Sequence, residues 1–143
     1  MISQKQYASR RRDLMAMMQG NSIAVIAAAP EKIRSKDTHY PYKQSTNLSY
    51  LSGFPEPQSV MLLIPGRSQG DVVFFCRDKD LLRETWDGYR QGPAGAVQNF
   101  GADDAFPIDD IDDILPGMLE GRDRVYYGIG KDAEFDKHLM EWV

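Results

Sequence analysis

The chain has 143 residues, of which 42% are hydrophobic and 27% are charged, with a formal net charge of −4. These values are typical of one globular domain, here residues 1–143, and the negative charge argues against a nucleic-acid surface, which needs a basic stripe. The single cysteine, Cys76, excludes an internal disulfide. No apolar run approaches the roughly 20 residues of a membrane-spanning helix and no secretory leader is recognisable, so we expect a soluble, cytoplasmic protein.

The first predicted elements are a helix and a buried strand. Ser3 followed by Gln6 is a capping-box pattern, and the apolar spacing that follows predicts a helix over 4–19, ended by Gly20. Its methionines are expected to pack in the core. The apolar run 22–28 predicts a strand covered on both faces, because its apolar residues are continuous rather than alternating.

Two more apolar runs predict a hairpin. The strands cover 59–64 and 71–77, and the short connection between them contains Pro65 and Gly66, which favours antiparallel pairing. Cys76 lies in the second run and is expected to be a small buried side chain. A single helical turn is expected within 47–52.

The second half of the chain alternates short helices and strands. A helix is predicted over 78–86, with an aspartate at its N-cap and Leu81 and Leu82 on one face. Another is predicted over 94–100. Phe106 and Pro107 indicate the end of a strand.

The last elements are two helices separated by a strand. A helix over 108–118 should be kinked or shortened by Pro116, because proline lacks the backbone donor. A strand over 124–129 and a final helix from Asp132 follow. The chain ends inside this helix without a polar tail, from which we expect a piece of a longer protein.

Catalytic patterns are weak in this chain. His39 and His138 lie in unrelated settings and no HExxH motif is present. Cys76 has no histidine near it in sequence that could act as its base. Four aspartates at 109, 110, 112 and 113 could resemble a cation site, but complementarity to a helix dipole explains them better. We therefore expect no catalytic centre within these residues.

The stretch 34–57 has a different character. It combines tyrosines and a phenylalanine with hydrogen-bonding side chains and follows neither a helix nor a strand period, which is typical of an ordered functional loop. We expect the run with Asp37, Tyr40 and Tyr42, residues 35–45, to be ordered against the sheet, with the tyrosine hydroxyls hydrogen-bonded. The alternative is a polar connection whose aromatic side chains cover the edge of a core.

Two segments together resemble the amino-terminal domain of the aminopeptidase P (Xaa-Pro aminopeptidase) family. The first segment matches that family at Arg34, Asp37, Tyr40, Tyr42, Gln44, Ser45, Gly53, Phe54, Glu56 and Pro57. The second segment matches it at Arg77, Asp80, Glu84, Trp86, Gly88, Arg90 and Gly92. The chain departs from the family pattern at Lys43, Asn47 and Leu48, where arginine, aspartate and an aromatic residue are common.

The resemblance implies an α/β fold, with a mixed β-sheet and flanking helices in a ribonuclease-H-like layer topology. It also implies that this chain is the non-catalytic domain of a peptidase that releases the N-terminal residue before proline. The two manganese ions of such an enzyme belong to a separate carboxy-terminal catalytic domain. The implied partners are that domain, a proline-containing peptide and further copies of the protein, with no nucleic acid and no membrane.

The same resemblance gives the domain a role in walling the active-site cleft and in subunit contacts. It puts Trp86, with Gly88 and Arg90, at the mouth of the cleft, where an indole can stack on the substrate proline. The alternative for Trp86 is that it closes the short helix and packs on Leu82. At the level of the whole protein, a prolidase or creatinase-like enzyme and a stand-alone interaction module remain alternatives.

Overall fold

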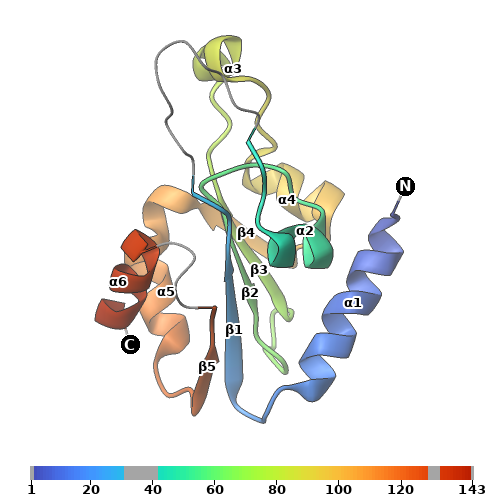
Figure 1. Ribbon diagram of the computed structural model, residues 1–143, viewed down its shortest axis with the longest axis vertical. Helices are drawn as coiled ribbons and strands as arrows, with labels where there is room; N and C mark the ends of the chain where they lie inside the picture. The colour runs from blue at the N-terminus through green and yellow to red at the C-terminus, as the bar shows by residue number, and fades with distance from the viewer. Residues whose placement is uncertain (1, 31–41, 129–132, 143) are drawn as a thin grey trace.

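The computed structural model describes residues 2–30, 42–128 and 133–142, which form one sheet with helices around it (Figure 1). The strands are β1 (Ser22–Ala27), β2 (Val60–Leu63), β3 (Val72–Cys76), β4 (Asp104–Pro107) and β5 (Arg124–Tyr126). They lie in the order β4-β3-β2-β1-β5. The neighbours β1, β2 and β3 are antiparallel, which confirms the predicted hairpin, whereas the edge strands β4 and β5 run parallel to β3 and β1.

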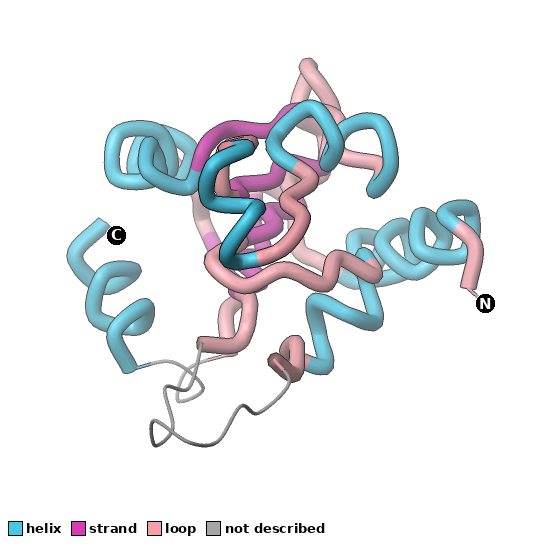
Figure 2. Tube along the Cα trace, turned by 90° about the horizontal axis from the view of Figure 1, so that it is seen from above, coloured by secondary structure: helices cyan, strands magenta, loops and turns pink. Residues whose placement is uncertain are grey.

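Helices cover both faces of this sheet, as the view from above in Figure 2 makes plain. On one face lie α1 (Gln4–Met17), α2 (Thr46–Ser52) and α4 (Gly92–Phe100), and on the other lie α5 (Ile111–Leu119) and α6 (Ala133–Trp142). A 3-10 turn, Ile108–Asp110, leads into α5. The predicted α/β class with a mixed sheet is therefore confirmed.

The core has two halves, one on each face of the sheet. In β2, Met61 and Leu63 face the first half while Val60 and Leu62 face the second, and all four are buried. This explains the continuous apolar sequence of the central strands, since neither face of them meets water. Phe54 is fully buried in the first half, where its ring lies 5.3 Å from that of Phe74.

The first helix begins as predicted but ends differently. The Ser3 hydroxyl accepts a hydrogen bond from the Gln6 backbone N–H at 3.2 Å, and the Gln6 side chain accepts one from the Ser3 backbone at 2.9 Å. The helix ends at Met17, and the left-handed residue after it is Asn21, with φ 54°, rather than Gly20. Asparagine tolerates this conformation because its short side chain can hydrogen-bond locally.

The prediction that the methionines of α1 pack in the core is only partly correct. Met15 and Met18 pack against the first half of the core, but Met17 is 74% exposed. The inward face instead includes Arg11, which is buried and donates to the Leu51 carbonyl at 2.9 Å. A charged residue therefore lies on the face that hydrophobic spacing reserves for apolar side chains.

The helix around Pro116 continues further than expected. Helix α5 runs through Pro116 to Leu119, because the proline removes only the one hydrogen bond that its own N–H would donate. Leu115 and Leu119 are buried on the side facing the sheet. The four aspartates at 109, 110, 112 and 113 are exposed at the start of this segment, in agreement with their interpretation as solvated residues.

Candidate functional site

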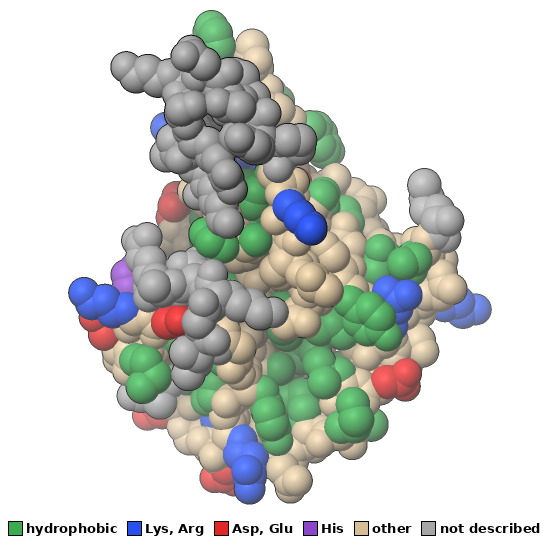
Figure 3. All heavy atoms as spheres, viewed as in Figure 1, with side chains coloured by type: hydrophobic (Ala, Val, Ile, Leu, Met, Phe, Trp, Pro, Cys, Tyr) green, Lys and Arg blue, Asp and Glu red, His purple; other side chains and the backbone are tan. Residues whose placement is uncertain are grey.

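A segment that we call the α3 arm, residues 78–90, leaves the sheet after β3 and returns at α4. It contains α3 (Leu81–Asp87) and forms the top of the molecule in Figure 1. Figure 3 shows hydrophobic side chains on the surface there. No described residue of the arm belongs to either half of the core. As far as the described residues go, the arm is thus an excursion from the sheet that core packing does not hold in place.

The arm exposes large apolar side chains to solvent. Trp86 is 88% exposed, and Leu81, Leu82 and Tyr89 are exposed as well. Leu81 and Leu82, which were predicted on one face of a short helix, are both exposed, since this two-turn helix stands away from the sheet. The packing of Trp86 on Leu82 as a buried pair is also excluded by these exposures. A cluster of exposed apolar side chains of this kind marks an interaction or ligand surface.

Helix α3 has defined ends despite its exposure. Asp80, not Asp78, is its N-cap, and the Asp80 carboxylate accepts from the backbone N–H groups of Leu82 and Arg83 at 3.1 and 3.2 Å. Gly88 follows the helix with φ 95°, and its N–H donates to the Glu84 carbonyl at 3.1 Å. A side chain at Gly88 would meet open space, so the backbone angle is what favours glycine there.

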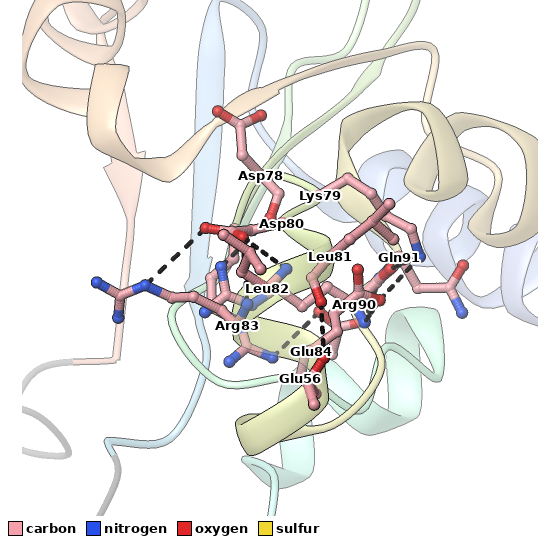
Figure 4. Close-up of polar contacts among 12 residues, drawn as sticks. Glu56, Asp78, Lys79, Asp80, Leu81, Leu82, Arg83, Glu84, Arg90 and Gln91 are labelled. Atoms are coloured by element: carbon pink, nitrogen blue, oxygen red, sulfur yellow. Dashed lines mark hydrogen bonds and ion pairs between the residues drawn. The ribbon is translucent and has the colours of Figure 1, made fainter.

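Glu84 joins the two ends of the arm (Figure 4). Its Oε1 accepts from the Lys79 ammonium at 2.9 Å and from the Arg90 backbone N–H at 2.8 Å. The Arg90 backbone donor, together with Lys79, holds the pKa of Glu84 below its usual value, and the Glu84 carboxylate raises the pKa of Lys79. The Lys79 ammonium also donates to the Arg90 carbonyl at 2.7 Å and lies 3.7 Å from the centre of the Tyr89 ring.

Glu56 makes a second connection, at the base of the arm. This residue is 7% exposed, and its two carboxylate oxygens have different partners. One accepts from the Arg77 guanidinium at 3.3 Å and the other from the Gln91 backbone N–H at 2.8 Å. Arg77 precedes the arm and Gln91 follows it as the N-cap of α4, so a single carboxylate connects the residues on either side of the arm.

The described part of the 34–57 stretch contacts Glu56 through the side chain of Gln44. The Gln44 amide accepts from the Ala29 backbone N–H at 3.0 Å and donates to the carbonyls of Phe54 and Glu56 at 3.1 and 2.8 Å. Tyr42 donates its hydroxyl to the Ala29 carbonyl, as expected for an ordered tyrosine. The end of β1 is therefore linked through Gln44 to the residue that holds the arm.

The predicted site residues separate into four groups. Trp86, Gly88 and Arg90 come together on the arm, and Tyr42 and Gln44 both hydrogen-bond to Ala29. Gly53 and Phe54 are structural. Gly53 ends α2 with φ 71°, and a Cβ atom on it would lie 2.6 Å from the Tyr7 ring. The predicted positions Arg34, Asp37 and Tyr40 lie outside the described residues.

Glu56 and Glu84 match the family pattern in sequence, but the sequence assigns neither of them a role. Both carboxylates join parts of the chain that are not neighbours in sequence. Glu56 contacts Gln91, which lies 35 positions away, and Glu84 connects residues on either side of α3. Spacing along the chain carries no signal for such a contact. The only signal in the sequence was that Glu56 and Glu84 each lie beside aromatic and glycine residues.

The described residues do not fit a metal centre. Among them, no group of three or more His, Cys, Asp or Glu side chains could hold an ion. The two manganese ions that the family resemblance implies therefore have no ligand set in this part of the structure. Within the same residues, no helix is long and apolar enough to cross a membrane.

Comparison with known proteins gives one family. Residues 7–126 match the family model described as aminopeptidase P, N-terminal domain. The Xaa-Pro aminopeptidase of Escherichia coli K12 is 39% identical over 136 residues, which cover 94% of this chain and 31% of that protein. Human Xaa-Pro aminopeptidase 3 is 34% identical over 138 residues, covering 88% of this chain and 27% of the relative.

Solved structures give the same result. The aminopeptidase PepP of Pseudomonas aeruginosa superimposes with a TM-score of 0.95 at 56% identity, covering 99% of this chain and 32% of that one. A zinc-substituted Escherichia coli aminopeptidase P in complex with product superimposes with a TM-score of 0.92 at 37% identity, again over 99% of this chain and 32% of the other. The chain thus spans about a third of the length of the relatives it matches.

Proposed function

The chain belongs to the aminopeptidase P N-terminal domain family, and from that membership we propose that it serves as the non-catalytic domain of an Xaa-Pro aminopeptidase. In this proposal, the longer protein releases the N-terminal residue of peptides whose second residue is proline. The domain walls the active-site cleft and presents the α3 arm to the substrate.

The exposure of Trp86 is the observation that carries this role. An indole that is 88% exposed on a segment outside the core contributes little to folding, so its contacts must be sought outside this domain. A flat aromatic face suits a proline ring, because both are apolar and rigid. Gly88 and Arg90 then act as the residues that shape the turn after Trp86.

The chemistry itself is assigned to another part of the protein. A pair of manganese ions in a carboxy-terminal catalytic domain would activate the water that attacks the peptide bond. The residues described here would orient the substrate and restrict access to the cleft. They take no part in proton transfer or metal binding in this proposal.

Further copies of the protein and a cytoplasmic location complete the proposal. Leu81 and Tyr89, which the arm also exposes, are suited to a contact with the catalytic domain or with a second subunit. The relatives named above are Xaa-Pro aminopeptidases, which supports this activity over a prolidase or a creatinase-like enzyme.

The proposal is tested with the full-length protein that contains this chain. Hydrolysis of an Xaa-Pro peptide with added Mn²⁺ should be measured for the natural sequence, Trp86→Ala, Trp86→Phe and Leu82→Ala. We expect a drop of about tenfold or more in kcat/KM for Trp86→Ala, partial recovery with phenylalanine, and little change for Leu82→Ala, which is almost as exposed. Equal losses for Trp86→Ala and Leu82→Ala would instead indicate a docking surface.

A further inference from the structure

The α3 arm has a narrow base at which its two ends meet. The residues that flank it, Arg77 and Gln91, both donate to the carboxylate of Glu56, at 3.3 and 2.8 Å. Glu56 lies on neither end of the arm, because it comes from the segment between α2 and β2. It therefore acts as a bridge that a third segment supplies.

A second bridge lies one step further out. Lys79 is near the start of the arm and Arg90 is at its end, and Glu84 accepts from both, at 2.9 and 2.8 Å. The Lys79 ammonium also donates to the Arg90 carbonyl at 2.7 Å, so Lys79, Glu84 and Arg90 are all connected to one another. The Arg90 guanidinium donates to the Asp78 carbonyl at 3.3 Å. Figure 4 shows these groups clustered beside α3.

We propose that Glu56 and Glu84 are positioning residues, which hold the α3 arm closed at its base and so fix where Trp86 stands. The part of this inference that concerns Trp86 rests on the function proposed above. The part that concerns the arm rests only on the two bridges. In this role the two carboxylates act through the arm and not by contact with the substrate.

Two bridges of this kind matter because the described residues of the arm belong to neither half of the core, so core packing among the described residues does not oppose its opening. Hydrogen bonds to charged groups are stronger than neutral ones, and each carboxylate here accepts two. Removing one bridge should free the arm while the sheet stays folded.

The arm itself is tested by hydrogen–deuterium exchange in the full-length protein, followed in peptides that cover residues 78–92. Glu84→Gln keeps the shape of the side chain and removes its charge, and Lys79→Met removes the matching ammonium. We expect each to speed exchange in these peptides by roughly threefold to tenfold while peptides from β2 and β3 keep their natural rates. Glu120→Gln, a change of the same chemistry at an exposed residue, is the control.

Glu56→Gln tests the bridge at the base of the arm, with Arg77→Met as its partner variant. Because Glu56 is buried, its replacement could loosen the whole domain, in which case β2 and β3 would also exchange faster. The inference then depends on Glu84→Gln and Lys79→Met, which change only the arm. Natural exchange rates across 78–92 in both of those variants would overturn it.

Peptidase kinetics separate this inference from the function it builds on. If both hold, Glu84→Gln lowers kcat/KM for an Xaa-Pro peptide, mainly through a higher KM, and adds little to the loss already caused by Trp86→Ala. Faster exchange without any kinetic change would support the role of the bridges and overturn the cleft role of Trp86. A kinetic loss without faster exchange would overturn the bridges.

Discussion

The carboxylate of Glu56 accepts a hydrogen bond from the backbone N–H of Gln91 at 2.8 Å, across 35 positions of sequence. This contact, with the one from Arg77, ties the start of α4 to the end of β3 through a buried acid.

Replacement of Glu56 by alanine should therefore destabilise the chain. It removes two hydrogen bonds to a carboxylate and leaves the largely buried Arg77 guanidinium without this partner, for an expected loss of about 2–3 kcal/mol in the free energy of unfolding. Urea denaturation measures the loss. Glu120→Ala, at an exposed position, should change the midpoint little.

The two aromatic residues Phe54 and Trp86 should respond oppositely to the same substitution. Phe54→Ala opens a cavity in the core and should cost about 3–5 kcal/mol of stability. Trp86→Ala should cost well under 1 kcal/mol, because the indole is almost fully exposed already. Thermal or urea unfolding of the two variants side by side gives the comparison, and a large loss for Trp86→Ala would contradict its exposed position.

Gly53→Ala should be destabilising for two reasons. The residue has φ 71°, and the added methyl group would lie 2.6 Å from the Tyr7 ring. The left-handed conformation alone costs about 1 kcal/mol for alanine, and the contact adds to it. In a Tyr7→Ala background the steric part should disappear, so the two substitutions should be non-additive in the measured free energy of unfolding.

The link between Lys79 and Glu84 should be sensitive to pH at both extremes. Since the pKa of Glu84 is lowered by folding, its contribution is complete above the usual value of 4.5 and is lost as the pH falls through the lowered pKa. Since the pKa of Lys79 is raised, its contribution is complete below 10.5 and is lost as the pH rises through the raised pKa. The rotational freedom of Trp86, followed by fluorescence anisotropy in a Trp142→Phe background, should be lowest between these limits.

Cys76 should be inert in the folded protein. Burial first of all, with the nearby carboxylate of Glu56, raises the pKa of its thiol to about 12. A thiol reagent at pH 8 should therefore react only when the chain unfolds, since the thiolate is the reactive form. Reaction at the rate of a free thiol in native buffer would contradict the buried position.

The elements that sequence predicted well are those determined by neighbouring residues. The capping box of Ser3 and Gln6 and the hairpin around Pro65 and Gly66 depend on a few adjacent positions, and both form as expected. The continuous apolar strands also indicated their two covered faces correctly. In each case, residues close together in sequence were sufficient to predict the element.

The features that the sequence left open have the opposite origin, because they depend on residues that are far apart in the chain. Leu81 and Leu82 follow a helical pattern, but whether a helix has a sheet to pack against is decided by the path of the whole chain. The roles of Glu56 and Glu84 depend likewise on which distant residues the fold brings to them. The family resemblance put Trp86 at a surface, whereas nothing in the sequence indicated the bridges beneath it.

The parallel pairing of β1 with β5 has a consequence for synthesis. Asn21, just before β1, donates to the Gly121 carbonyl at 2.8 Å, a contact that spans 100 residues. At about 5–20 residues per second, a ribosome needs roughly 5–20 s to make the intervening chain. Throughout that time the outer edge of β1 has unpaired backbone groups, which invite pairing with another nascent chain. Slower translation between β1 and β5 should therefore raise the aggregated fraction, even though the sequence and stability of the finished protein stay the same.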